Sequence, residues 1–377
     1  MAKDFKLPVK DNDVIGSING FLRDMLEKEL VHAILVPQEV PSGDNVVQTL
    51  VRDPDNLEKA NPLCPVMGVN SSRIISRMTK HSPNSRKVAA VLKPCELRAL
   101  VELIKLKQAS IENMVIIGID CLGTYPLKHY KNMIEKGTSP TLEILKAAEE
   151  ERDDPDLRTA CQVCEHFIPL GADIVVGLIG KDLEKDIFLR ANTEEGERIL
   201  SGLKLEGNEG PGVTDKREDA ITRLFTERTK KRDALFEETK KEIGSPDKLL
   251  SFFSACIKCH NCMGVCPICY CRECFFGSPT FDFEPEKYLT WAERKGSIKM
   301  PTDTLLFHLT RMNHMLLSCV GCGVCEEACP NDIPLFRVFR MLGHNVQQLF
   351  NYVPGKNPEE EPPLSAFKED ELKDVGE

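Results

Sequence analysis

The 377-residue sequence predicts two domains of different class, an α/β domain followed by an α-rich domain organised around cysteines. Two observations lead to this prediction. Short, continuously apolar segments alternate with amphipathic helical segments over residues 1–210, and two cysteine runs of identical spacing lie in the last third of the chain. The length leaves room for two domains, each with its own buried core.

The α/β prediction depends on apolar segments whose composition is typical of strands buried on both faces of a sheet. These segments are residues 32–36, 88–92, 114–119 and 174–179. An amphipathic helix precedes the first segment, and its apolar positions are Ile15, Ile18, Leu22, Met25 and Leu26. A second helix, starting near Glu96, separates two of the strands. Because strand, helix, strand is the pattern of a parallel βαβ unit, residues 1–210 are assigned to an α/β domain.

Residues 211–250 are predicted to connect the two domains. The segment 204–214 contains three glycines and a proline, which is typical of a linker. A long charged helix then starts near Asp215, which has capping-box spacing to Glu218, and it ends before Gly244. Its charged face is interpreted as solvated surface, with docking of a partner as the alternative.

The C-terminal domain is defined by two copies of the pattern C-x2-C-x2-C-x3-C-P. The copies are Cys256, Cys259, Cys262 and Cys266 before Pro267, and Cys319, Cys322, Cys325 and Cys329 before Pro330. In two-cluster ferredoxins, three thiolates of such a run bind one 4Fe–4S cluster, and the fourth binds the other cluster. One cluster is therefore predicted on Cys256, Cys259, Cys262 and Cys329, and another on Cys319, Cys322, Cys325 and Cys266.

Residues 251–352 are accordingly predicted to form an α-rich dicluster (2×4Fe–4S) ferredoxin-like domain that transfers electrons. Apolar helical faces at 305–316 and from Leu335 onward are expected to cover the clusters and exclude water, which helps to set cluster potentials.

Other metal chemistry fits the cysteine pattern less well. A zinc site uses four ligands in two pairs, so the third cysteine and the final C-P would be superfluous. Residues 256–260 match the C-x-x-C-H haem attachment motif, but Cys262 follows at once and the charged first residues contain no export signal. A structural or regulatory zinc module stays open as an alternative.

The composition argues against several classes of protein. A net charge of −10, with one Trp and five Tyr, argues against nucleic-acid binding. No segment approaches the ~18 apolar residues of a membrane span, so no direct membrane insertion is expected. Sixteen cysteines without a secretory signal predict a cytoplasmic protein of an organism living with little oxygen. No hydrolase motif or phosphate-binding loop is present, and no catalytic residue is assigned.

Four further cysteines are candidate ligands of a third cluster. Cys95 and Cys121 each follow a predicted strand directly, and Cys161 and Cys164 form a C-x-x-C pair. Because loops at the carboxyl ends of parallel strands converge on one rim, where ligands bind, the four thiols are expected to lie close together. The alternative is that isolated cysteines serve as small buried hydrophobic residues.

Four motifs around these cysteines resemble one known family. They occur in the order Pro94-Cys95, Asp120-Cys121-Leu122-Gly123, Cys161-Gln162-Val163-Cys164 and Ala172-Asp173-Ile174-Val175-Val176-Gly177. The family is the beta subunit of coenzyme F-420-reducing hydrogenases and F-420-linked formate dehydrogenases, in its long type with a C-terminal dicluster domain. The resemblance covers roughly residues 60–180. It implies that Cys95, Cys121, Cys161 and Cys164 hold a 4Fe–4S cluster beside a flavin (FAD), which exchanges a hydride with a diffusible carrier.

The resemblance also implies a function. The chain would be an iron–sulfur electron-transfer subunit of a cytosolic oxidoreductase complex. It would relay electrons between a hydride carrier, or a formate dehydrogenase or hydrogenase catalytic subunit, and a heterodisulfide-reductase-type flavoprotein. Since no G-x-G-x-x-G fingerprint occurs, Gly177 and Gly180 are the expected points of close cofactor approach, with a plain turn as the alternative. A flavin-free iron–sulfur wire between two enzymes is the alternative function.

The remaining cysteines are Cys64, Cys269, Cys271 and Cys274. The last three lie within six residues, and with one distant partner they are candidates for a fourth cluster; otherwise they line the existing clusters or an interface. His166, close to Cys164, is a candidate hydrogen-bond donor to a cluster thiolate. Residues 353–377 are rich in Pro, Glu and Lys and are predicted to form a disordered acidic tail.

Overall fold

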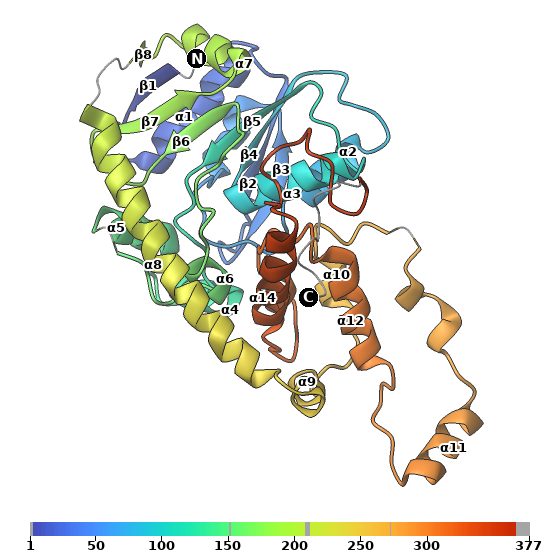
Figure 1. Ribbon diagram of the computed structural model, residues 1–377. Helices are drawn as coiled ribbons and strands as arrows, with labels where there is room; N and C mark the ends of the chain where they lie inside the picture. Colours follow the sequence, from blue (N-terminus) through green and yellow to red (C-terminus); the bar gives the residue numbers. More distant parts are fainter. Residues whose placement is uncertain (1–2, 151, 208–211, 272, 367–377) are drawn as a thin grey trace.

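The computed structural model describes residues 3–150, 152–207, 212–271 and 273–366. Within them the first domain is built on an eight-stranded sheet of order β3-β2-β4-β5-β6-β7-β1-β8 (Figure 1). The central strands run parallel and are β2 (Ala33–Glu39), β4 (Val88–Leu92), β5 (Met114–Ile119) and β6 (Ile174–Gly177). The outer strands pair antiparallel and are β3 (Val46–Val51), β7 (Asp186–Ala191), β1 (Lys3–Pro8) and β8 (Glu206–Gly207).

Helices cover both faces of this sheet, and alternate strand residues contribute to two separate cores. The first core includes residues of α1 (Val14–Glu27) and α7 (Glu194–Gly202), and the second includes residues of α2 (Ser72–Thr79) and α3 (Pro94–Lys105). In β2, Ile34 and Val36 belong to the first core, whereas Leu35 belongs to the second. The α/β prediction is confirmed, because continuously apolar strands are what a sheet covered on both faces requires.

Strand β2 continues past Pro37, where the sequence predicted that it ends. The parallel pairing of β2 with β4 stops at Leu35; the later residues pair with β3, and Gln38 forms an isolated bridge with Ala60. Proline is tolerated in a strand where no neighbour needs its missing N–H group.

The segment between β5 and β6 carries three helices that the sequence did not predict. They are α4 (Leu127–Glu135), α5 (Pro140–Glu149) and α6 (Thr159–Gln162). Helix α5 begins with Pro140 after Ser139, whose hydroxyl accepts a hydrogen bond from the Leu142 N–H at 3.4 Å, and proline in the first turn is a common start signal. This segment carries Cys161 back towards the rim of the sheet.

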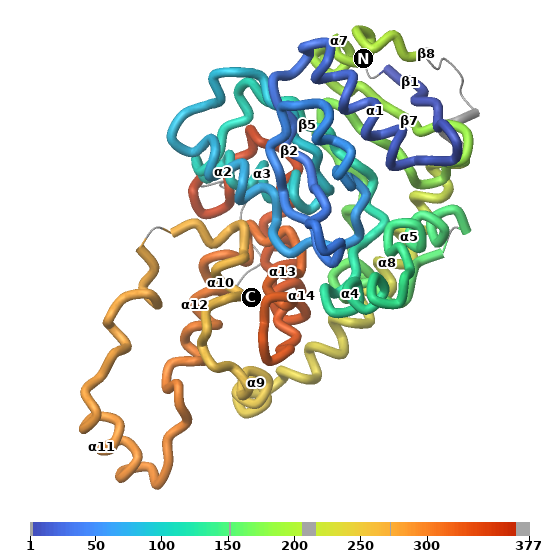
Figure 2. Tube along the Cα trace, turned by 180° about the vertical axis from the view of Figure 1, so that it is seen from behind, coloured from blue at the N-terminus to red at the C-terminus, as the bar shows by residue number. Residues whose placement is uncertain are grey.

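Helix α8 (Gly212–Glu242) is the predicted charged helix, and it begins three residues before Asp215. It runs from the sheet to the C-terminal domain, where α9 (Pro246–Phe252) follows (Figures 1 and 2). Arg217 Nη2 donates to Asp120 Oδ1 at 2.9 Å, and Arg228 Nη2 donates to Asp153 Oδ1 at 2.8 Å. Both pairs are buried, so they fasten α8 to the loops that follow β5.

The C-terminal domain consists of short helices around the two cysteine runs, flanked by two longer helices. The short ones are α10 (Asn261–Gly264) and α13 (Val324–Glu327), and the longer ones are α12 (Thr304–Met315) and α14 (Leu335–Leu349), at the predicted positions. Between the runs lies a lobe with α11 (Pro285–Lys295) that projects away from the rest of the molecule in both views (Figures 1 and 2). No residue of α11 is buried.

The prediction of disorder from residue 353 is wrong for the start of the tail. The Gly355 N–H donates to Glu102 Oε1 at 2.8 Å, and the Pro354 carbonyl accepts a hydrogen bond from Arg98 Nε at 2.9 Å. At Gly355, φ is +75° and an added Cβ would lie 2.4 Å from the Cα of Arg98, so only glycine fits. A polar composition does not reveal such contacts. Residues 367–377 lie outside the described part of the chain.

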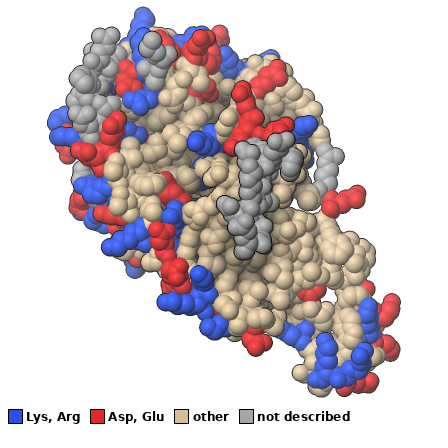
Figure 3. Space-filling view, in the orientation of Figure 1, with Lys and Arg blue, Asp and Glu red and all other residues tan. Residues whose placement is uncertain are grey.

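Among the described residues, no helix combines the length and the apolar character needed to cross a membrane. In the view of Figure 3, charged side chains are spread over the first domain and α8, whereas the C-terminal domain shows few of them between α8 and the projecting lobe.

Candidate iron–sulfur sites

The first group of thiols is Cys256, Cys259, Cys262 and Cys329. These four residues line one hollow of about 330 Å³, counted with its open mouth, together with Phe307 and His308. Burial raises the pKa of Cys262, and the neighbouring thiols of Cys256, Cys259 and Cys329 raise it further. The crossing ligand predicted from the second run, Cys329, therefore does lie beside the first run.

The second group is Cys319, Cys322, Cys325 and Cys266. Burial raises the pKa of Cys319, Cys322 and Cys325. The neighbouring Cys266 thiol raises each of these three pKa values further. The two runs thus exchange their fourth cysteines, as their spacing predicts. Iron binding at these particular thiols stays a prediction.

The donor set of the first group suits a cluster. No three His, Cys, Asp or Glu side chains in the described ranges are placed to hold one metal ion. A zinc site would need four ligand atoms within about 2.3 Å of the ion. Cubane thiolates bind separate irons and stand farther apart, which fits four neighbouring thiols around a hollow.

The third group is Cys95, Cys121, Cys161 and Cys164, gathered at the rim of the sheet. Cys95 lies in the first turn of α3, just after β4, and Cys121 lies two residues beyond β5. Burial raises the pKa of Cys121 to about 12, with the Cys161 thiol adding to the effect, and the Cys121 thiol in turn raises the pKa of Cys95. The convergence expected for loops at the carboxyl ends of parallel strands is what the structure has.

The second and third groups are neighbours. The Cys322 thiol contributes to the raised pKa of Cys95, although burial is the larger cause. The Arg158 guanidinium spans the same gap, because its Nη2 lies 3.8 Å from the Cys161 Sγ and 3.4 Å from the Cys322 carbonyl oxygen. The first group adjoins the second through the exchanged cysteines, so the three groups follow one another through the protein.

Several N–H and O–H groups point at the candidate ligands, and no sequence motif indicates them. Arg311 Nη1 lies 3.0 Å from the Cys262 Sγ, and His308 Nε2 lies 3.4 Å from the Cys256 Sγ. Thr124 Oγ1 lies 3.3 Å from the Cys161 Sγ. Hydrogen bonds to sulfur are one of the means by which a protein sets a cluster's potential. The donors come from distant parts of the chain, so a local signal for them is not to be expected.

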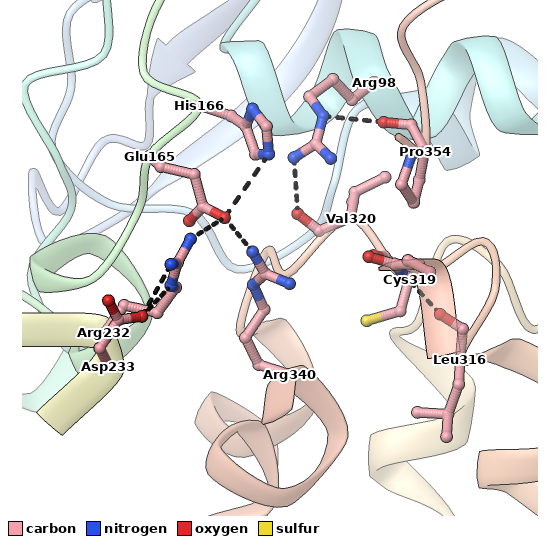
Figure 4. Close-up of polar contacts among 11 residues, drawn as sticks. Arg98, Glu165, His166, Arg232, Asp233, Leu316, Cys319, Val320, Arg340 and Pro354 are labelled. Atoms are coloured by element: carbon pink, nitrogen blue, oxygen red, sulfur yellow. Dashed lines mark hydrogen bonds and ion pairs between the residues drawn. The ribbon is translucent and has the colours of Figure 1, made fainter. Parts of the chain in front are cut away.

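A buried carboxylate next to Cys164 joins the two domains (Figure 4). Glu165 accepts hydrogen bonds from Arg340 on α14 and from Arg232 Nη1 on α8, the latter at 3.2 Å. Burial alone would raise the pKa of Glu165, but Arg340, His166, Arg232 and a backbone hydrogen bond together outweigh it and lower the pKa to about 2. The His166 side chain points at Glu165, with 3.7 Å between Nε2 and Oε1. The predicted bond from the His166 ring to a thiolate is absent from the described contacts, and its backbone N–H faces Cys164 instead.

The four unassigned cysteines do not meet. Cys64 is buried in a separate core, with its Sγ 3.4 Å from the Tyr130 hydroxyl. Cys269 and Cys274 are partly buried against the core of the dicluster domain, 3.3 Å and 3.6 Å from methionine sulfurs, and Cys271 is exposed. This placement favours the alternative in which the 269–274 segment lines the existing sites.

The predicted flavin-contacting glycines are approached by protein. A Cβ on Gly177 would lie 2.6 Å from the Phe188 ring, and one on Gly180 would lie 2.8 Å from the Cα of Arg217 on α8. Gly180 also lines a hollow of about 540 Å³, counted with its mouth, together with Leu122, Arg152 and Arg228. Flavin binding here stays a prediction.

An α/β domain with four thiols at its rim, joined to a domain with eight thiols in two crossed groups, defines a two-domain iron–sulfur protein. Residues 85–208 match the family model for the C terminus of the coenzyme F420 hydrogenase/dehydrogenase beta subunit. Residues 252–333 match the 4Fe-4S dicluster domain. Residues 85–208 thus match the family that the motifs resemble, and the resemblance is confirmed.

Curated relatives match along most of the chain. The F420-dependent formate dehydrogenase subunit beta of Methanocaldococcus jannaschii is 27% identical over 370 residues, covering 90% of this chain and 91% of that protein. The F420-dependent formate dehydrogenase 1 subunit beta of Methanococcus maripaludis is 28% identical over 385 residues, covering 93% and 92%. A solved chain of the F420-reducing NiFe hydrogenase complex from Methanosarcina barkeri, studied with xenon, is 15% identical with a TM-score of 0.46. It covers 64% of this chain and 92% of its own length.

Proposed function

We propose that this protein is a cytoplasmic electron-transfer subunit of an oxidoreductase complex and that it carries three 4Fe–4S clusters, one on each group of four thiols. The observation that carries the proposal is the adjacency of the groups. The Cys322 thiol of the second group raises the pKa of Cys95 in the third group. The second group also exchanges a candidate ligand with the first group. The curated relatives, named as formate dehydrogenase beta subunits, support this role.

The fold supplies what a chain of clusters needs. The clusters would carry the electrons, while the protein fixes their spacing and keeps water away. Phe307, Met315 and Phe339 are buried in the same core as Cys262 and Cys266. The apolar faces of α12 and α14 thereby shield the thiols, which is the role expected for these helices.

For the end of the path at the sheet, we propose FAD beside the third group and a deazaflavin of the F-420 type as hydride carrier. The hollow lined by Gly180 adjoins Leu122, the residue after Cys121. Its walls combine apolar side chains, such as Ile144 and Leu224, with arginines, which suits an aromatic ring bearing phosphates. Bound there, the flavin would exchange a hydride, which carries two electrons, with the carrier and would pass single electrons to the clusters.

The partners proposed are a catalytic subunit of the formate dehydrogenase or hydrogenase type and a heterodisulfide-reductase-type flavoprotein. A sparsely charged face on the C-terminal domain suits such contacts (Figure 3). Exposed apolar side chains of this domain include Ile257, Leu306, Leu309 and Leu349.

The function is tested by anaerobic purification of the full chain with counts of iron, acid-labile sulfide and flavin. Three clusters require about twelve irons per chain, whereas about eight would remove the third cluster from the proposal and about sixteen would add a fourth. A colourless protein containing zinc and no sulfide would overturn the proposal. The variant Cys95→Ser should lose about four irons. Cys64→Ala is the matched control, because Cys64 is a buried thiol of the same domain that lies outside the three groups, and its iron content should be unchanged.

The second candidate function is that of an iron–sulfur protein that transfers electrons between two enzymes without a flavin, and one observation favours it. Helix α8 covers the backbone at Gly177 and Gly180, where the flavin was expected to approach most closely. About twelve irons with no extractable flavin would select this candidate. One flavin per chain would exclude it.

A further inference from the structure

Two buried arginines lie where neighbouring thiol groups meet. Arg311, on α12, is 3% exposed, and it donates from Nη1 to the Cys262 Sγ at 3.0 Å and from Nη2 to the Cys262 carbonyl at 3.2 Å. Its charge also interacts with Cys266 and Cys325 of the second group. Arg311 therefore stands between the first and second groups.

Arg158 has the corresponding place between the second and third groups. It is 6% exposed and lies at the start of α6. Its Nη2 faces the Cys161 Sγ and the Cys322 carbonyl, and its charge also interacts with Cys95. Each of the two junctions along the path thus contains a buried arginine that contacts a candidate ligand, and Arg98, which donates to the Val320 carbonyl, also lies at the second junction.

Both guanidinium groups have N–H groups without acceptors. Arg158 Nε and Nη1 and Arg311 Nε are buried and have no hydrogen-bond partner within the described part of the chain. Buried polar groups in proteins are almost always hydrogen-bonded. These unpartnered groups lie beside the thiols, where the sulfur atoms of bound clusters are natural acceptors.

Other buried arginines of this chain are satisfied differently. Arg217 is paired with Asp120, and Arg228 with Asp153, by charge-assisted hydrogen bonds. The strongest interactions of Arg311 are with thiols, and Arg158 interacts with thiols and with one carboxylate, Glu327. The positive charges of Arg158 and Arg311 therefore interact mainly with the candidate clusters.

We propose that Arg158 and Arg311 are positioning residues of the electron path, each donating hydrogen bonds to the two clusters at its junction and raising the reduction potential of both. This inference rests on the proposed three-cluster function. A cluster becomes more negative when it accepts an electron, and a fixed cation at low dielectric favours the reduced form. The second cluster borders both arginines, so its potential is raised from two sides.

The planar fork of arginine suits this position. A guanidinium presents five N–H donors in a fixed geometry and stays charged when buried, so one side chain can serve two acceptors. A lysine ammonium is a compact point charge. Lysine variants should therefore keep part of the effect, and glutamine variants should lose the charge entirely.

The test is an anaerobic redox titration of the full chain followed by electron paramagnetic resonance. In Arg158→Gln and in Arg311→Gln, two of the three clusters should each show a fall of about tenfold or more in the ratio of reduced to oxidised form at a fixed potential. Tenfold corresponds to 59 mV for one electron. The cluster that shifts in both variants is the second one. Arg158→Lys and Arg311→Lys should show smaller shifts of the same clusters.

The control is Arg190→Gln, because Arg190 pairs with Asp4 on the outer strands, away from the thiols, and it should move no potential. Glutamine variants with full iron and wild-type potentials would overturn the inference. If a glutamine variant loses iron, the lysine variant decides, and unmoved potentials there overturn it as well. A wild-type protein without sulfide would instead reject the proposed function itself.

Discussion

A Cβ on Gly323 would lie 2.4 Å from the Cβ of Ala160, and φ at Gly323 is +71°. Gly323 follows Cys322, and Ala160 precedes Cys161, so the close contact lies between the second and third thiol groups. A bare backbone at this point lets the loop of one domain lie directly on the helix of the other.

Gly323→Ala should therefore destabilise the contact between the domains. Strain at positive φ and the clash with Ala160 are expected to cost about 1–3 kcal/mol each, and relief by separation would slow electron transfer between the two clusters. Denaturant unfolding and the rate at which the third cluster reduces the second would measure both effects. Gly264→Ala is the control, since an added Cβ there meets nothing within 4 Å. A Gly323 variant as stable as this control would contradict the expectation.

The Asp153 carboxylate should hold α8 in place. Arg228 is 2% exposed in its side chain, so Asp153→Asn leaves a buried charge without its partner, and the free energy of unfolding should fall by about 3–5 kcal/mol. Asp182→Asn, which breaks the exposed pair with Lys185, should leave the free energy of unfolding nearly unchanged. Equal effects of the two substitutions in urea unfolding would disprove the role of Asp153.

The same pair predicts a pH dependence. Burial opposes ionisation of Asp153, but the hydrogen bond and charge of Arg228 outweigh it and lower the pKa below its usual value. A depressed pKa stabilises the folded state above the unfolded pKa of about 3.9, and this contribution is lost as the pH falls towards the folded pKa. The loss of stability on acidification below about pH 4 should thus be smaller in Asp153→Asn than in the wild type.

Tyr352 should anchor the start of the tail to α3. Its hydroxyl lies 2.7 Å from both the Glu102 carboxylate and the Lys105 Nζ, and the carboxylate is fully buried. Tyr352→Phe removes hydrogen bonds to charged groups and should lower the free energy of unfolding by about 1.5–3 kcal/mol. Tyr270→Phe is the control, because the Tyr270 side chain is exposed and its hydroxyl has no described hydrogen bond to the protein. Thermal unfolding of the two variants would separate them, and equal midpoints would reject the anchor.

Iron removal should affect the two domains unequally. Cys262 and Cys266 belong to the hydrophobic core of the dicluster domain, and Cys256, Cys322, Cys325 and Cys329 pack against it, whereas the sheet of the first domain has cores of its own. Chelation under mild oxidation is therefore expected to open residues 252–352 to proteolysis while the sheet stays protected. Mass spectrometry of the fragments would show this, and first cuts within the sheet would refute it.

The sequence allowed prediction of the features that follow from local spacing. The crossed grouping of Cys266 and Cys329 follows from a repeated motif, and the meeting of Cys95 with Cys121 follows from two strands whose loops share a rim. Both features depend on residues whose separation along the chain is itself informative.

Arg311 and Arg340 could not be predicted in this way. Arg311 contacts Cys262 from a helix 49 residues further along the chain, and Arg340 reaches Glu165 across 175 residues. Such contacts depend on how the helices pack, and an arginine on an amphipathic helix is otherwise read as surface. The outer strands β1 and β7 were missed for a related reason, since charged residues such as Lys6 and Arg190 interrupt their apolar pattern.

Helix α8 is bonded to loops at two points, through Arg217 near the sheet and through Arg232 in its second half, beside α14. A linker attached in this way restrains the rotation of one domain against the other. Electrons would then cross a gap of constant length at every turnover. The rate of electron transfer would be governed by the difference in reduction potential between the clusters, because no domain has to move to bring them together.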